Sequence, residues 1–92
     1  MIRHIVFWKF RPDADPEPFL QALSALPEQI DWIRGMHVAR SAAPNAAWDA
    51  ALEVDFDTLE DVARYRDDPH HKKVSALCKS IRTDRVSIDI PL

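Results

Sequence analysis

The run Tyr65-Arg66-Asp67-Asp68-Pro69-His70-His71 divides one helical segment from the next. Proline has no backbone N–H and disfavours helical geometry at the residue before it, so a helix that reaches Tyr65 should end near Asp68. The same proline suits the first turn of a new helix, and Asp67 or Asp68 is placed to cap its free N–H groups. The run therefore predicts a helix break with His70 and His71 in the first turn of a second helix.

The position of His71 favours a neutral imidazole, because the positive end of a helix dipole opposes a second positive charge. A neutral imidazole is able to accept a proton, so His71 is a candidate general base. We expect His70 to be its surface neighbour. The same run also fits a plain corner between two helices with a surface histidine pair.

Length and composition predict one globular domain over residues 1–92. The net charge of −3 gives no electrostatic reason to expect nucleic acid or an anionic membrane as a partner. No apolar run reaches membrane-spanning length, and we expect no secretory leader. The single cysteine, Cys78, excludes an internal disulfide and favours a cytoplasmic location, and the single glycine excludes a Gly-rich phosphate loop.

Alternating apolar residues predict strands over 2–10, 32–40, 48–56 and 85–90. Apolar residues at helical spacing predict three helices. The first covers 16–26, the second is capped by Asp57 or Thr58 and runs through Tyr65, and the third begins at Pro69. A glycine near the start of the second strand, Gly35, suggests a bulge or bend. The inward helical positions are expected at Leu59, Val62, Ala63, Val74, Leu77, Cys78 and Ile81.

The element order β-α-β-β-α-(α)-β is that of an α+β, ferredoxin-like fold. Right-handed crossovers then give a four-stranded antiparallel sheet in the order 4-1-3-2 with helices on one face. The 2–10 strand is apolar on both faces, with Val6 and Trp8 on one and Ile5 and Phe7 on the other. Helices are enough for one face only, so we expect a homodimer through the other sheet face.

Five short motifs run from end to end of the chain: Met1-Ile2-Arg3-His4-Ile5-Val6, Leu26-Pro27-Glu28-Gln29-Ile30, Val54-Asp55-Phe56, Tyr65 through His71, and Ile88-Asp89. In their order and spacing they resemble the Dabb family, the stress-responsive dimeric α/β-barrel proteins. The resemblance implies a ferredoxin-like protomer whose sheet packs on that of a second protomer to close a barrel. Most members of the family have no assigned activity.

A plant polyketide cyclase of this family runs an intramolecular aldol condensation, and similarity to it implies roles for four residues of this chain. They are His4, Tyr65, His71 and the acidic Asp89. The reaction needs a base, for which His71 fits, and a donor such as the Tyr65 hydroxyl for the developing oxyanion. His4 and Asp89 fall on facing ends of neighbouring strands, where a hydrogen bond would orient the imidazole. We expect all four to line one cavity between sheet and helices.

Three more residues share the helix-side face and would shape that cavity: Trp8, Arg85 and Ser87. The Trp8 indole is large enough to fill the space a substrate needs. Arg85 and Ser87 make the lining more polar than an alkyl-chain polyketide requires. An open pocket would therefore favour a small anionic or polar ligand, with Arg85 as its charge partner.

The alternatives to an enzyme site stay open at this stage. His4, His71 and Asp89 offer an N/N/O ligand set, but no close spacing supports a metal site, and we expect no metal and no cofactor. Haem mono-oxygenases share the dimeric barrel plan, which is an analogy of fold only. Cys78 sits on an apolar stripe and is expected to be buried. The second hypothesis is a non-catalytic dimeric ligand-binding or stress protein with structural histidines.

Overall fold

The sheet is built around β1 (Ile2–Phe10), which pairs antiparallel with β3 (Ala50–Phe56) on one side and with β4 (Arg82–Pro91) on the other. β2 (Gly35–Arg40) pairs with β3 and completes the order β2-β3-β1-β4. The structure, a computed structural model, describes all 92 residues. The predicted ferredoxin-like α+β fold and strand order are confirmed.

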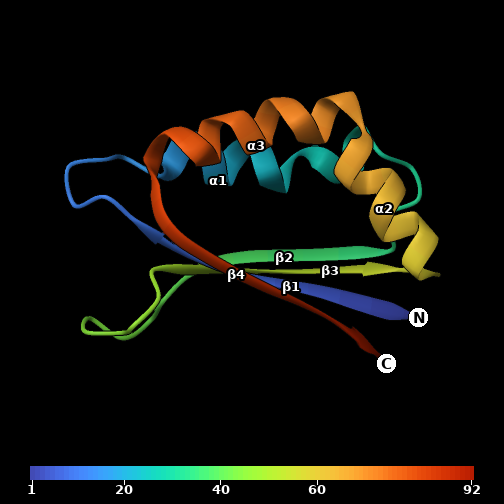
Figure 1. The fold of residues 1–92 in the computed structure, drawn as a ribbon, viewed down its shortest axis with the longest axis horizontal. Coiled ribbons are helices and arrows are strands. Elements are labelled where there is room, and N and C mark those ends of the chain that lie inside the picture. Colours follow the sequence, from blue (N-terminus) through green and yellow to red (C-terminus); the bar gives the residue numbers. More distant parts are fainter.

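Three helices, α1 (Glu17–Ser24), α2 (Leu59–Asp67) and α3 (Pro69–Ile81), lie on one face of the sheet (Figure 1). The apolar sides of the sheet and the helices bury one another, which is the main favourable contribution to folding in a domain of this size. The buried hydrophobic core consists of Val6, Trp8, Phe19, Leu20, Leu23, Leu26, Ile30, Ala50, Leu52, Val54, Phe56, Val62, Tyr65, Val74 and Cys78.

The predicted break between the second and third helices is confirmed. α2 ends at Asp67, Asp68 is extended, and Pro69 opens α3. The Asp68 carboxylate caps α3 by accepting a hydrogen bond from the His70 N–H at 2.8 Å. At the start of α2 the Thr58 hydroxyl accepts from the Asp61 N–H at 3.2 Å.

Two expected boundaries on the first half of the chain are wrong. The first helix ends at Ser24, and Pro27 lies inside a separate 3-10 turn, Leu26–Glu28, because its ring fits the first turn of a new short helix. The second strand begins only at Gly35, since the preceding Trp32 points to α2 and its indole N–H donates to the Asp61 carbonyl at 3.2 Å.

The bulge or bend suggested by Gly35 is not present at the start of β2. The β2–β3 register is unbroken, and a Cβ atom on Gly35 would make only an ordinary contact, 3.7 Å from Asp55 Oδ2. Neither a tight approach nor a positive φ requires a glycine at this position.

The third strand starts at Ala50, and Trp48 does not share its buried face as expected. Trp48 instead packs against Phe7 on the opposite face of the sheet, with ring centroids 6.1 Å apart. β4 begins earlier than expected, at Arg82, because Arg82 pairs with Phe10 through a register shift at the end of β1.

Three of the expected inward helical positions are exposed. Val62 and Tyr65 are the buried residues of α2. Ala63 follows Val62 directly, so it points in a different direction and is exposed. Leu59 is exposed in the first turn. Val74 and Cys78 carry the buried side of α3, and Leu77 lies outside it.

The face of the sheet away from the helices has no cover within the chain (Figure 1). Phe7 lies opposite Val86 and Ile5 opposite Ile88 on this face, and Phe7, Val86 and Ile88 are 40%, 46% and 59% exposed. None of the helices combines the length and the apolar character needed to cross a membrane.

Candidate active site

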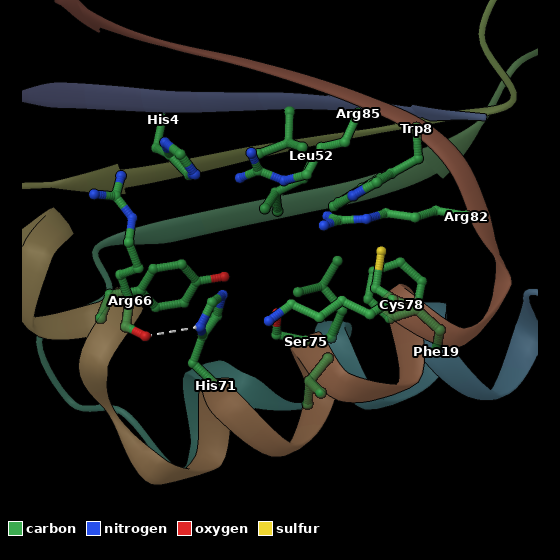
Figure 2. A pocket seen from close by; sticks show the side chains of 15 residues that line it. His4, Trp8, Phe19, Leu52, Arg66, His71, Ser75, Cys78, Arg82 and Arg85 are labelled. Atoms are coloured by element: carbon green, nitrogen blue, oxygen red, sulfur yellow. Dashed lines mark hydrogen bonds between the residues drawn. The ribbon is translucent and has the colours of Figure 1, made fainter. Parts of the chain in front are cut away.

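A cavity of about 270 Å³ lies between the sheet and the helices (Figure 2). Five of the residues predicted from the sequence line it: His4 and Trp8 on β1, Tyr65 near the end of α2, His71 in the first turn of α3, and Arg85 on β4. The break between α2 and α3 thus carries Tyr65 and His71 over the strand that holds His4.

The other two predicted residues lie behind this lining. Asp89 is paired with His4 across the β1–β4 ladder and reaches the cavity only through that imidazole. Ser87 lies 3.5 Å from Arg85 Nη1 and does not line the cavity.

His71 is held in one tautomer by the end of the preceding helix. Its Nδ1 lies 3.2 Å from the carbonyl oxygen of Arg66 (dashed line in Figure 2). A carbonyl oxygen only accepts hydrogen bonds, so Nδ1 carries the proton and Nε2 has a free lone pair. Burial lowers the pKa of His71 below its ordinary value of 6.5, so the imidazole is neutral at pH 7. Figure 2 shows the other ring nitrogen of His71 directed into the cavity.

His4 is fixed in a similar way by Asp89, whose Oδ1 lies 2.6 Å from His4 Nδ1. Burial lowers the pKa of His4 and outweighs the opposite effect of the Asp89 carboxylate. The contact is therefore a hydrogen bond from a neutral imidazole to a carboxylate, and it leaves the Nε2 lone pair free.

The Tyr65 hydroxyl is buried without any hydrogen-bond partner in the protein. The Tyr65 ring lies 4.3 Å from the His71 ring and 6.4 Å from the His4 ring, centroid to centroid. Burial raises the pKa of Tyr65 above its ordinary value of 10, so the hydroxyl stays protonated and remains a donor. Buried polar groups are almost always hydrogen-bonded, so this O–H in the cavity wall requires a partner from outside the protein, either water or a bound molecule.

Trp8 forms a wall of the cavity and does not fill it. Its ring packs edge-on against Phe19 with centroids 5.1 Å apart, and only 4% of the residue is exposed. The remaining volume of 270 Å³ corresponds to about nine water molecules, enough for a small organic molecule. The sequence left open whether Trp8 fills this space, and in the structure it leaves the cavity open.

The sequence analysis missed three basic residues of the lining, Arg66, Lys79 and Arg82. A signal for two of them was present, because Ser75 and Lys79 follow His71 at four-residue spacing along one side of α3, and Arg82, three residues further on, is the C-cap of that helix. Arg66 carried no such signal, since it follows the buried Tyr65 directly.

No metal-binding group is built from these residues. The structure contains no cluster of three or more His, Cys, Asp or Glu side chains placed to hold an ion, so His4, His71 and Asp89 do not form the N/N/O set considered above. Cys78 is buried as predicted, and burial raises the pKa of its thiol in spite of the nearby Arg82.

The antiparallel sheet, the helical layer on one face and the cavity between them define a small α+β protein of ferredoxin-like architecture. The chain matches the family described as the Stress responsive A/B Barrel Domain, Dabb, over residues 2–92. It belongs to this family, as its short motifs predicted.

Solved structures agree with this assignment. A dimeric protein of unknown function and ferredoxin-like fold from Bacteroides fragilis is 31% identical, with a TM-score of 0.89 over 99% of this chain and 95% of the other. A dimeric ferredoxin-like protein of unknown function from Thermobifida fusca is 27% identical, with a TM-score of 0.87 over 99% and 90%.

A third relative, the hydroxynitrile lyase of Passiflora edulis, is 14% identical, with a TM-score of 0.88 over 99% of this chain and 92% of the lyase. At that identity the likeness concerns the fold. No curated protein matches the chain.

Proposed function

We propose that this protein is a cofactor-independent lyase- or cyclase-like enzyme that moves a proton on a small carbonyl compound, with His71 as general base. The observation that carries the proposal is the neutral His71, whose Nδ1–H is held by the Arg66 carbonyl and whose Nε2 is free beside the unpartnered Tyr65 hydroxyl. A base and an oxyanion donor side by side are what carbon-acid chemistry requires.

The reaction that fits these groups is an intramolecular aldol addition. His71 Nε2 takes a proton from a carbon next to a carbonyl group, and the Tyr65 hydroxyl donates a hydrogen bond to the carbonyl oxygen as it gains negative charge. The enolate carbon then attacks a second carbonyl of the same molecule and forms a C–C bond. The His71 imidazolium returns its proton to the new alkoxide, which restores the enzyme. His4, oriented by Asp89, serves as the second polar group that positions the substrate.

The comparisons are compatible with a lyase reaction and identify no substrate. A protein named as a hydroxynitrile lyase shares the architecture at 14% identity. A lyase reaction is therefore compatible with this fold, but the proposal depends on the residues of this chain.

A non-catalytic ligand-binding or stress-response protein is the second candidate. The short hydrogen bond between His4 and Asp89 favours this candidate, because such a pair can be explained by its contribution to stability without any role in catalysis. The two candidates differ in whether His71 exchanges a proton with the bound molecule.

We further propose that the protein is a homodimer joined through the open face of its sheet. Phe7, Val86 and Ile88 present an exposed apolar strip there, and such strips on soluble proteins mark interaction surfaces. The relatives from Bacteroides fragilis and Thermobifida fusca are described as dimeric.

Proton exchange tests the enzyme proposal before a substrate is known. A panel of small ketones, neutral and carboxylated, is incubated with the protein in D₂O, and deuterium uptake next to the carbonyl is followed by NMR. We expect faster uptake for at least one compound, and a loss of about 100-fold or more in the His71→Ala variant.

The matched control is His70→Ala, which removes the neighbouring imidazole. His70 is exposed and paired with Asp68 outside the cavity, so this variant should keep the full rate. Uptake that is equal in wild type and His71→Ala would rule out His71 as the base and favour the binding protein.

A further inference from the structure

The arginines of this chain divide into two groups. Five of the eight form ion pairs with carboxylates, and all five lie outside the cavity: Arg3, Arg11, Arg34, Arg40 and Arg64. The remaining three, Arg66, Arg82 and Arg85, have no carboxylate within ion-pair distance, and all three line the cavity. The arginines without an ion pair are therefore gathered at one place.

The charge of the cavity wall opposes that of the whole chain. Lys79 joins the three arginines, and no Asp or Glu side chain lines the cavity, although the protein carries a net charge of −3. Burial and the neighbouring Arg82 and Arg66 lower the pKa of Arg85, which remains charged at pH 7. Like charges held together without a counter-charge are unfavourable, and an anion among them removes that cost.

The two arginines of β4 reach different parts of the cavity. Figure 2 shows Arg82 close to Trp8 and Cys78, and the Arg85 guanidinium extending toward His4. Arg85 therefore lies between Arg82 and the candidate reactive groups, and its charge acts on His4, Tyr65 and His71. His4 and Trp8 are four residues apart on β1, about 13 Å along an extended strand.

We propose that the substrate of this cavity carries a carboxylate that binds Arg82 and Arg85, while its carbonyl group lies against Tyr65 and His71. The inference deepens the proposed function and rests on it for the reacting end of the molecule. Guanidinium groups match the two oxygens of a carboxylate with paired hydrogen bonds. The Trp8 and Phe19 rings and the limited volume suit a short chain or single ring between the two ends.

A single negative charge fits this site better than the double charge of a phosphate ester. Arg82 is the C-cap residue of α3, so it sits at the end of the helix where the dipole is negative. That dipole weakens the attraction for a second negative charge at the same point. We therefore assign the anion as a carboxylate.

Benzoate, benzamide and phenyl phosphate separate these possibilities by calorimetric titration of the full chain at pH 7. Benzoate should bind. Benzamide has the same shape without the charge, and its affinity should be lower by about tenfold or more. Arg82→Gln and Arg85→Gln should each weaken benzoate binding by about tenfold. Arg11→Gln removes the same charge from an exposed pair with Asp13 and should leave binding unchanged.

Arg85→Lys controls for loss of binding that is caused by a change in structure. It keeps the positive charge, so it should bind benzoate with an affinity between those of the wild type and Arg85→Gln. Equal binding of benzamide and benzoate, or full benzoate binding by both glutamine variants, would overturn the carboxylate site. Phenyl phosphate binding tighter than benzoate would overturn the assignment of the anion.

The same titration on His71→Ala distinguishes this inference from the proposed reaction. Arginine-dependent benzoate binding in that variant supports the carboxylate site even if the wild type exchanges no proton. If proton exchange depends on His71 but benzoate does not bind, the proposed reaction is supported and the carboxylate site is ruled out.

Discussion

Tyr65 brings an uncompensated polar atom into an otherwise apolar core. Only 1% of the residue is exposed, and its hydroxyl has no partner in the protein. A buried group of this kind costs about 1–3 kcal/mol of stability, since it loses its hydrogen bonds to water on folding. Under the proposed function, the same hydroxyl donates a hydrogen bond to a substrate oxygen, which would offset this cost.

Tyr65→Phe should therefore separate stability from activity. We expect the free energy of unfolding of the ligand-free protein to stay the same or rise by about 1 kcal/mol, because the unpaired O–H is removed and the ring is kept. The exchange of ketone protons should fall by about tenfold or more. Urea denaturation and NMR measure the two effects, and a loss of more than 1 kcal/mol of stability would contradict the account of the hydroxyl.

His4 and His71 predict a loss of stability on mild acidification. Burial lowers the pKa of both below the ordinary 6.5, so the unfolded chain binds more protons than the folded one just below that pH. Their contribution is complete above about pH 6.5 and is lost as the pH falls through the lowered folded values. Denaturation curves from about pH 7 to about pH 5 should show the decline, in a range above the titration of most carboxylates.

A variant of His71 checks the assignment of that decline. His71→Gln should reduce the dependence of stability on pH, because it removes one of the two buried imidazoles. The same slope in the variant and in the wild type would show that His71 does not titrate in this range.

The break between α2 and α3 is the element that positions His71 in the cavity. Pro69 stops one helix and starts the next, and the Arg66 carbonyl left free at the end of α2 orients His71. Local rules predicted this break from sequence because proline and its cap act within a few residues. The starts of β2 and β3 were placed wrongly. Trp32 and Trp48 have strand propensity, but Trp32 contacts α2 and Trp48 packs on Phe7 on the open face of the sheet.

The two helix caps allow a matched test at this scale. Asp68→Ala and Thr58→Ala each remove an N-cap, and each should cost about 1 kcal/mol of stability. Only Asp68 caps the turn that holds His71, so Asp68→Ala should also slow proton exchange, by about tenfold, through loss of the imidazole's position. Equal exchange rates in both variants would show that the cap does not position His71.

The whole molecule has one covered and one uncovered sheet face. With about half of Phe7, Val86 and Ile88 exposed, the protomer leaves apolar surface in water that a second copy would bury. An antiparallel sheet is stable with one solvated face only when that face is polar, which is the reason to expect an interface here.

Ile88→Asp should convert the dimer into a folded monomer, because it places a charge in the exposed apolar strip of the proposed interface. Light scattering coupled to gel filtration measures the mass, and circular dichroism checks the fold. Leu77→Asp is the control, since Leu77 is a comparably exposed leucine on α3, on the helical side of the molecule. A wild-type protein that is monomeric at high concentration, or an unchanged dimer in Ile88→Asp, would rule out this face.

The sequence by itself determined the strand order, the helix break and the pairing of His4 with Asp89, because alternation, proline geometry and antiparallel register are local or follow from topology. Only the tertiary structure decided that Trp8 packs on Phe19 and leaves a cavity, and that Arg66, Lys79 and Arg82 gather on its wall. These outcomes depend on how residues distant in the sequence fill or leave space between the sheet and the helices. Periodicity carries no information about that volume, nor about which cations are left without a carboxylate.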